Sequence, residues 1–430
     1  MRRLLVHRNR MAPRVAAAVL AFSGAGAIGA DFEPPATFQA SKVVPAELLK
    51  GPHHAVAEAV KEEGFYQQFQ ITSEFGNIGA VGRTVLRTRV TETGALARLS
   101  EVSKGEVFAK AAGGAVLNVG KGVASVVTAP VDTAKGLGDG VKRFGTNLGR
   151  KGKRAADSAT KDDKTPEGSE PTEEKALDAA GGAANSVLGV NSAARKWAKE
   201  LGVDPYTTNP VLHKALVDVG KIDSAGSIVT KVVLPIPPVV STTATAGGLV
   251  WGADPEALRK TNEGRLVELG ASKEVASRYL INGNYTLTSQ TRFIAALHAV
   301  KAKGCADYVD AAAEAANERE ALFFVESAEL LAGLHKTQPV TAVLEDSRAM
   351  IARTGTTAVA LLPLDWVRWT ERLQKSAIEI ASRAKQELGA GTLELRVSGT
   401  VTPTAKAGLG ASGWTVKERV VAGLAVTPAD

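Results

Sequence analysis

The spacing of hydrophobic positions changes several times along the chain, and each spacing predicts a different element. Within Phe65–Phe75 apolar residues occupy every second position, which is typical of a strand with one buried face. The run Thr84–Thr91 also alternates, and glycines between the two runs favour turns. The sequence therefore predicts a β-hairpin within residues 65–91, and a short helix over 46–63 before it.

Residues 177–390 show apolar spacings of three and four, interrupted by helix-start signals. Asn209-Pro210 and Asp254-Pro255 place a capping side chain directly before a proline, and Asn317 with Glu320 resembles a capping box. A final helix is expected over 364–388. The predicted fold is mainly α: a multi-helix orthogonal bundle with small β-hairpin elements near the N- and C-terminal ends, with an α+β arrangement left open.

The C-terminal tail returns to alternation. Leu393, Leu395 and Val397 follow a period of two, and residues 413–421 offer a further strand. Strand signals at both ends of the chain raise the hypothesis that the N-terminal hairpin and the tail share one sheet.

Residues 105–150 form a glycine-rich amphipathic segment. Its apolar face contains Val116, Val119, Val123, Val127, Leu137, Val141 and Phe144, and its cationic side chains include Lys121, Lys135, Lys142 and Arg143. Each glycine costs a helix about 1 kcal/mol relative to alanine, so this segment needs a surface to fold against. Two surfaces qualify: the protein's own core, or a bilayer interface with anionic head groups.

These patterns divide the chain into six parts. They are a signal peptide (1–30), an N-terminal arm with a short helix and hairpin (31–104), the amphipathic segment (105–150), a charged flexible linker (151–176), a helical body (177–390) and a small β-containing tail (391–430).

The charge pattern agrees with export. Residues 1–30 contain five arginines and no lysine or acid, followed by the apolar run Val15–Phe22 and small residues up to Ala30, as in a secretory signal. Removing them lowers the formal charge from +7 to +2, so the mature chain does not call for nucleic acid. Residues 104–154, with ten basic and three acidic side chains, keep a local +7. Cys305 is the only cysteine, so no intramolecular disulfide forms.

Searches for local chemical motifs return no catalytic residue. The phosphate-loop, dinucleotide, nucleophile-elbow and zinc patterns all fail on spacing or context, so neither a cofactor nor a metal is expected. Trp366 and Trp369 are candidates for lining a ligand groove, although tryptophans at helical spacing more often belong to a core.

The sequence thus favours an exported, non-enzymatic envelope protein of the periplasm or cell surface. It is expected to associate with an anionic membrane surface or an envelope protein through residues 105–150. Two alternatives stay open: a hydrolase-like periplasmic enzyme whose site is assembled from scattered residues, and a helical protein-binding module. Oligomeric state and ligand are not predicted.

Overall fold

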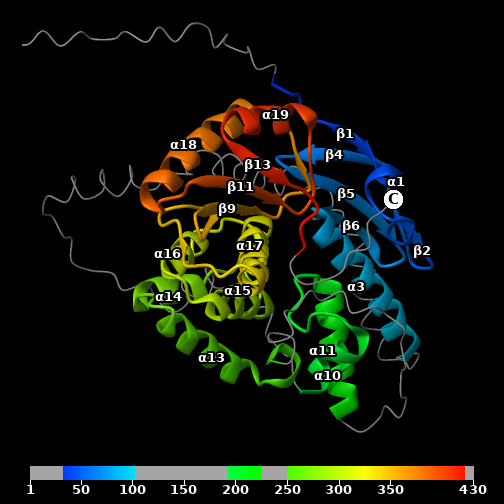
Figure 1. The fold of residues 1–430 in the computed structure, drawn as a ribbon. Coiled ribbons are helices and arrows are strands. Elements are labelled where there is room, and N and C mark those ends of the chain that lie inside the picture. Colours follow the sequence, from blue (N-terminus) through cyan, green and yellow to red (C-terminus); the bar gives the residue numbers. More distant parts are fainter. Residues whose placement is uncertain (1–31, 103–191, 225–248, 422–430) are drawn as a thin grey trace, which may run out of the picture. The chain divides into compact units, whose positions relative to one another are not determined.

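Strands account for more of the fold than the sequence pattern predicts. The computed structural model describes residues 32–102, 192–224 and 249–421 (Figure 1). Of these residues 53% are helical and 20% lie in strands, which form three multistranded sheets. The predicted mainly α bundle is therefore wrong, and the described chain is an α+β protein. The predicted signal peptide, amphipathic segment and linker lie outside the described residues.

The first sheet is antiparallel and uses six strands. Their bounds are β1 Thr37–Gln39, β2 Lys50–Gly51, β3 His54–Val56, β4 Ala59–Glu63, β5 Tyr66–Ser73 and β6 Gly76–Val81. The order is β1-β4-β5-β3-β2, and β6 also pairs with β5. Phe69 and Ile71 on β5 are fully buried, so the predicted strand is confirmed. The expected helix over 46–63 is wrong beyond α2 (Ala46–Leu49), because Gly51-Pro52 disfavours a continuing helix.

The hairpin partner of β5 differs from the prediction. β6 pairs with β5, whereas the alternating run Thr84–Thr91 lies in helix α3 (Arg83–Val102), which packs on this sheet. Leu86, Arg89 and Thr93 are buried at helical spacings of three and four. The same residues fit both periods, and contact with the sheet selects the helix.

Further helices precede the second sheet, in addition to the helical residues 249–252. They are α10 Ser192–Leu201, α11 Pro210–Ser224, α13 Pro255–Glu268, α14 Lys273–Leu280, α15 Leu287–Val300, α16 Cys305–Ala312 and α17 Glu318–Thr337. The predicted caps Asn209, Asp254 and Asn317 each accept a backbone hydrogen bond at a helix start. None of the described helices has the length and apolarity that a membrane span requires.

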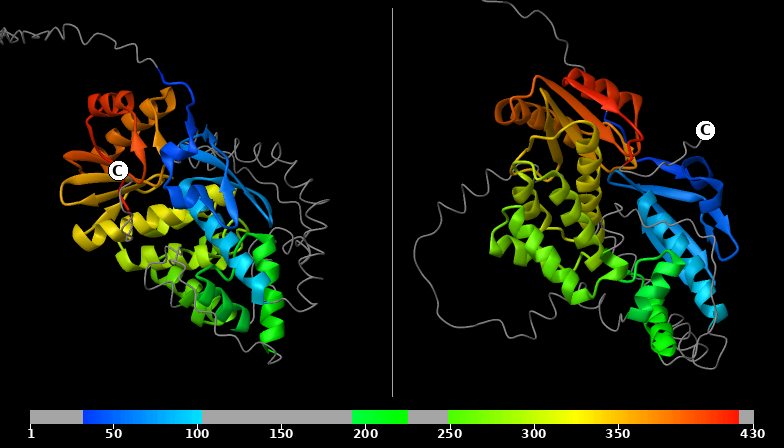
Figure 2. Two further views of the ribbon diagram at one scale, coloured as in Figure 1. Left: turned by 90° about the vertical axis from the view of Figure 1, so that its right-hand side faces the viewer. Right: turned by 60° about the horizontal axis from the view of Figure 1, so that its bottom comes forward.

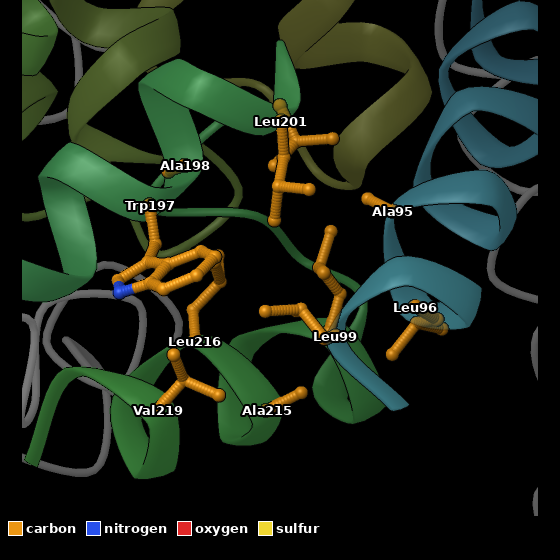
Figure 3. Packing of buried hydrophobic residues seen from close by; sticks show 11 residues of the cluster. Ala95, Leu96, Leu99, Trp197, Ala198, Leu201, Ala215, Leu216 and Val219 are labelled. Carbon is orange, nitrogen blue, oxygen red and sulfur yellow. The ribbon is translucent and has the colours of Figure 1, made fainter. Parts of the chain in front are cut away.

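α3, α10 and α11 meet in one apolar cluster (Figure 3). Leu99 of α3 packs with Trp197 of α10 and Leu216 of α11, and all three side chains are buried. Helices on either side of residues 103–191 are therefore held together by apolar burial, which contributes about 25 cal/mol per Å² of apolar surface.

The second sheet has the order β13-β11-β9-β8-β7. Its strands are β7 Ala342–Val343, β8 Met350–Thr354, β9 Thr357–Leu362, β11 Thr392–Val397 and β13 Trp414–Lys417. α18 (Glu371–Glu387) and α19 (Pro403–Ala411) connect its parallel strands on one face, and α17 covers the other (Figures 1 and 2). Because β9 is buried on both faces, its sequence is a continuous apolar run without alternation. The period-two pattern therefore did not predict this strand.

The tail does not pair with the N-terminal hairpin. β11 pairs with β9 on one side and β13 on the other, so both of its edges are occupied and the shared-sheet hypothesis is wrong. Backbone contacts link the two regions instead: Asp365 N and Trp366 N both donate to Phe65 O at 3.1 Å. Trp366 itself lies in β10 (Trp366–Val367), which pairs with β12 (Thr400–Val401).

Candidate functional site

A cavity of about 100 Å³, lined by both apolar and charged groups, lies between four segments of the described chain. Its walls come from α3, the α10–α11 loop, the start of α15 and the start of α17. Eight of its eighteen lining residues carry a hydroxyl group. The charged lining residues are Arg89, Glu92, Asp204, Arg292 and Glu318. We call this cavity the Asp204 pocket.

Glu92 is the most deeply buried charge of the pocket. Its side chain is 2% exposed and accepts hydrogen bonds from Arg89 Nη1 at 2.9 Å and Asn209 Nδ2 at 3.1 Å, and a third from the Thr207 hydroxyl. Arg89 and Glu92 are three residues apart on α3 and therefore share a helix face. This carboxylate thus joins α3 to the α10–α11 loop.

Arg89 extends the same network to the start of α17. Its Nη2 lies 2.7 Å from the Thr208 hydroxyl oxygen and 3.2 Å from Glu318 Oε1. Burial by itself lowers the pKa of the Arg89 guanidinium, but the carboxylates of Glu92 and Glu318 outweigh burial and raise its pKa above the ordinary value. Arg89 therefore keeps its charge, as guanidinium groups in proteins do.

Asp204 has a different environment. Burial raises its pKa to about 6, although hydrogen bonds from the Thr288 hydroxyl and from Tyr206 N oppose the shift. Both of these bonds go to Oδ1, and in the described part of the chain no hydrogen bond is made to Oδ2. Asp204 is thus an acid with a pKa near 6 that borders a cavity.

Arg292 on α15 forms a bidentate pair with Glu329 on α17. Nε and Nη2 of Arg292 each lie 2.8 Å from an oxygen of Glu329. Burial raises the pKa of Glu329 and Arg292 opposes that shift, while burial lowers the pKa of Arg292 and Glu329 outweighs it. The pair leaves Nη1 of Arg292 outside the bidentate contact and fixes the orientation of the guanidinium at the pocket wall.

Helix starts bring these side chains together. Asn209 Oδ1 accepts from Val211 N at 3.1 Å at the start of α11, and Thr286 caps α15 by accepting from Ser289 N at 3.1 Å. Asn317 caps α17 one residue before Glu318. Capping satisfies N–H groups that a helix start otherwise leaves free. The pocket therefore offers its side chains, rather than the capped backbone donors, to a ligand.

A second buried polar group lies between the two sheets and contains Asp365, Gln67, Arg83, Arg319 and Tyr66, which we call the Asp365 cluster. Asp365 Oδ2 accepts from Gln67 N and Arg83 N, both at 3.1 Å. Burial raises the pKa of Asp365, and Arg83 opposes this shift. The guanidinium of Arg319 lies 4.5 Å from the centre of the Tyr66 ring. Residues 67 and 83 belong to the first sheet and α3, so this carboxylate connects distant parts of the chain.

The residues predicted to contact a membrane or partner lie outside the described residues, so their prediction stays open. Trp366 and Trp369 are described, and neither lines the Asp204 pocket. They also do not share a helix, because α18 begins only at Glu371. Trp366 packs edge-on against Phe38, while Trp369 is 2% exposed and packs closely against Gly408. The ligand-groove hypothesis stays a prediction.

Sequence reasoning did not single out the charged residues of the pocket. Asp204-Pro205 indicated only a helix stop, and Thr207 and Thr208 carried no motif. The one local signal was the spacing of Arg89 and Glu92, which is common on solvated helices. In the described ranges no group of three or more His, Cys, Asp or Glu is placed to hold a metal ion.

No protein-family model matches this chain, and neither a curated protein nor a solved structure shows significant similarity to it. Its function is therefore inferred from the chemistry of the pocket.

Proposed function

We propose that this protein binds a small polar solute in the Asp204 pocket. The observation that supports this function is the convergence of five charged side chains from four segments on one cavity. A hydrophobic core does not need charged side chains around a cavity, because apolar side chains fill the interior without the free-energy cost of removing charges from water. Clefts that combine buried charges with a perturbed carboxyl group are typical of binding and active sites.

The pocket walls are held in place before a solute arrives. Glu92 connects α3 to Thr207 and Asn209, and the Arg292–Glu329 pair connects α15 to α17. Side chains fixed by such contacts lose little conformational entropy on binding. Asp204 adds the capacity to accept or donate a proton near pH 6. This proton exchange is the chemistry that the site adds to binding.

Thermal unfolding of the full chain in the presence of small solutes tests this proposal. The panel contains amines, carboxylates, polyols and inorganic phosphate, each at the same ionic strength. We expect at least one class to raise the melting temperature, because a ligand that binds only the folded state stabilises it. The increase in melting temperature should be at least severalfold smaller in Asp204→Asn.

Glu379→Gln is the matched control, since it removes a carboxylate from an exposed position on α18. It should respond to the solutes as the unmodified chain does. If no solute class raises the melting temperature, or if Asp204→Asn responds fully, the pocket does not bind solutes and the proposal fails.

We also propose export and surface association through residues 105–150 as a second function. The sequence supports it through the local charge of +7 over residues 104–154 and through the apolar face. The structure adds that α3 and α10, the described helices on either side of this part of the sequence, pack in one apolar cluster (Figure 3). α3 itself carries pocket residues, and further pocket residues directly follow α10.

Co-sedimentation with vesicles of anionic or neutral lipid tests the second proposal. The full chain should bind anionic vesicles, and Val123→Asp with Val127→Asp should reduce binding at least tenfold, because charge on the apolar face opposes its burial. Val267→Asp, at a described exposed position on α13, is the control and should bind normally. If the chain sediments equally with neutral and anionic vesicles, or with neither, association with anionic lipid is contradicted.

A further inference from the structure

Three of the hydroxyl groups that line the Asp204 pocket donate their hydrogen atoms to carboxylates. Thr288 donates to Asp204, Thr207 to Glu92, and Thr208 to Glu318 at 2.7 Å. A threonine hydroxyl has one hydrogen to donate and two lone pairs that accept. Where the hydrogen goes to a neighbouring carboxylate, only acceptor capacity is left for a ligand.

The guanidinium donors are largely used as well. Arg89 points Nη1 at Glu92 and Nη2 at Thr208 and Glu318. Arg292 directs Nε and Nη2 to Glu329, which leaves Nη1 as its remaining nitrogen. Most of the positive charge at the pocket is therefore already matched by carboxylates of the protein.

Both oxygens of Glu92 accept hydrogen bonds, but Asp204 and Glu318 each have one oxygen that accepts none of the described hydrogen bonds. The described hydrogen bonds of Asp204 all go to Oδ1, and those of Glu318 all go to Oε1. Glu318 is 44% exposed and lies where the pocket meets solvent. The lining contains two arginines and three acids, so its net charge is −1 when Asp204 is ionised. An occupant that donates several hydrogen bonds and carries positive charge fits this lining.

We propose that the pocket recognises the primary ammonium group of a small organic amine through Asp204 and Glu318. An ammonium group has three donors and no acceptor, which complements free carboxylate oxygens and hydroxyl lone pairs. The cavity of about 100 Å³ has room for a small amine. This inference rests on the proposed solute-binding function and names its ligand class.

Protonation of Asp204 should control this affinity. The charged groups around it are Arg89 and Glu92 of α3, Arg292 of α15 and Glu318 of α17. An ammonium ion favours the ionised carboxylate, so binding lowers the pKa of Asp204 and releases a proton. With a pKa of about 6 in the free protein, the affinity should fall about tenfold between pH 7 and pH 5.

Calorimetric titration of the full chain with four probes of similar size tests the inference. The probes are ethanolamine, ethylene glycol, glycolate and glycine, which present an ammonium, a neutral, an anionic and a zwitterionic group. At pH 7 ethanolamine should bind at least tenfold more tightly than ethylene glycol or glycolate. Asp204→Asn should lose at least tenfold in affinity and abolish the pH dependence, and Glu318→Gln should weaken binding about threefold while keeping it.

The outcomes separate this inference from the function on which it rests. If glycolate or ethylene glycol binds more tightly than ethanolamine, or if only glycine binds, the ammonium assignment is overturned while solute binding stands. If Asp204→Asn retains the pH dependence, Asp204 is not the group that recognises ammonium. If no probe and no member of the broader solute panel binds, both proposals fail. If Asp204→Asn does not fold, the affinity of the Glu318→Gln variant and the pH profile of the unmodified chain still test the ammonium assignment.

Discussion

The Asp204 pocket and the Asp365 cluster both contain an aspartate whose pKa is raised by burial and an arginine nearby, yet their partners differ. Asp365 accepts two backbone N–H groups, from residues 67 and 83. Asp204 accepts one backbone N–H and one threonine hydroxyl, and it borders a cavity. A carboxylate bound to distant backbone holds the fold together, whereas one beside a cavity stays available to a ligand.

The largest expected effect concerns the Asp365 cluster. Asp365→Ala leaves two backbone N–H groups without their acceptor and removes the negative charge near the Arg83 guanidinium, and should lower the free energy of unfolding by about 3–5 kcal/mol. Asp204→Ala should cost less than about 1 kcal/mol, because water in the cavity can replace the carboxylate as acceptor for Tyr206 N and the Thr288 hydroxyl. Urea unfolding of both variants measures the difference. Equal losses would remove the distinction between the two sites.

The backbone beside Asp365 provides a second test. A Cβ atom on Gly399 would lie 2.0 Å from Asp365 O, so Gly399→Ala forces the two backbone segments apart. We expect a loss of about 3 kcal/mol in the free energy of unfolding. Gly410→Ala is the matched control, since Gly410 lies on α19 with open space around it and should gain about 0.5–1 kcal/mol. A neutral Gly399→Ala would show that this contact is not tight.

The smallest expected effect is an increase in the free energy of unfolding, not a decrease. Because burial raises the pKa of Asp204 from 3.8 to about 6, its contribution to stability is present below about pH 4 and is lost as the pH rises through 6. Asp204→Asn removes this loss and should stabilise the chain by about 1–2 kcal/mol at pH 7.5, which is a common trade-off at functional sites. Urea unfolding at pH 4.5 and 7.5 measures it, and a variant less stable at pH 7.5 would show that ionised Asp204 supports the fold.

Local sequence signals predicted those features whose partners are near in the chain. The caps at Asp254 and Asn317 accept bonds from residues two or three positions later, and the strand Tyr66–Ser73 was visible in its own alternation. Asn209-Pro210 likewise predicted where α11 begins. Such interactions need no knowledge of the remaining chain.

The sequence by itself thus determined helix starts, the alternating strands β5 and β11, a strand within residues 413–421 and the charge distribution. Tertiary structure decided that residues 84–91 form a helix, that β8 and β9 are strands, and that Trp366 pairs in a sheet. It also assembled the pocket, in which Thr207 lies 115 positions from Glu92 and Thr288 lies 84 positions from Asp204. Burial and the pKa of a carboxyl group depend on all the atoms packed around it, and those atoms come from segments whose meeting no local pattern specifies.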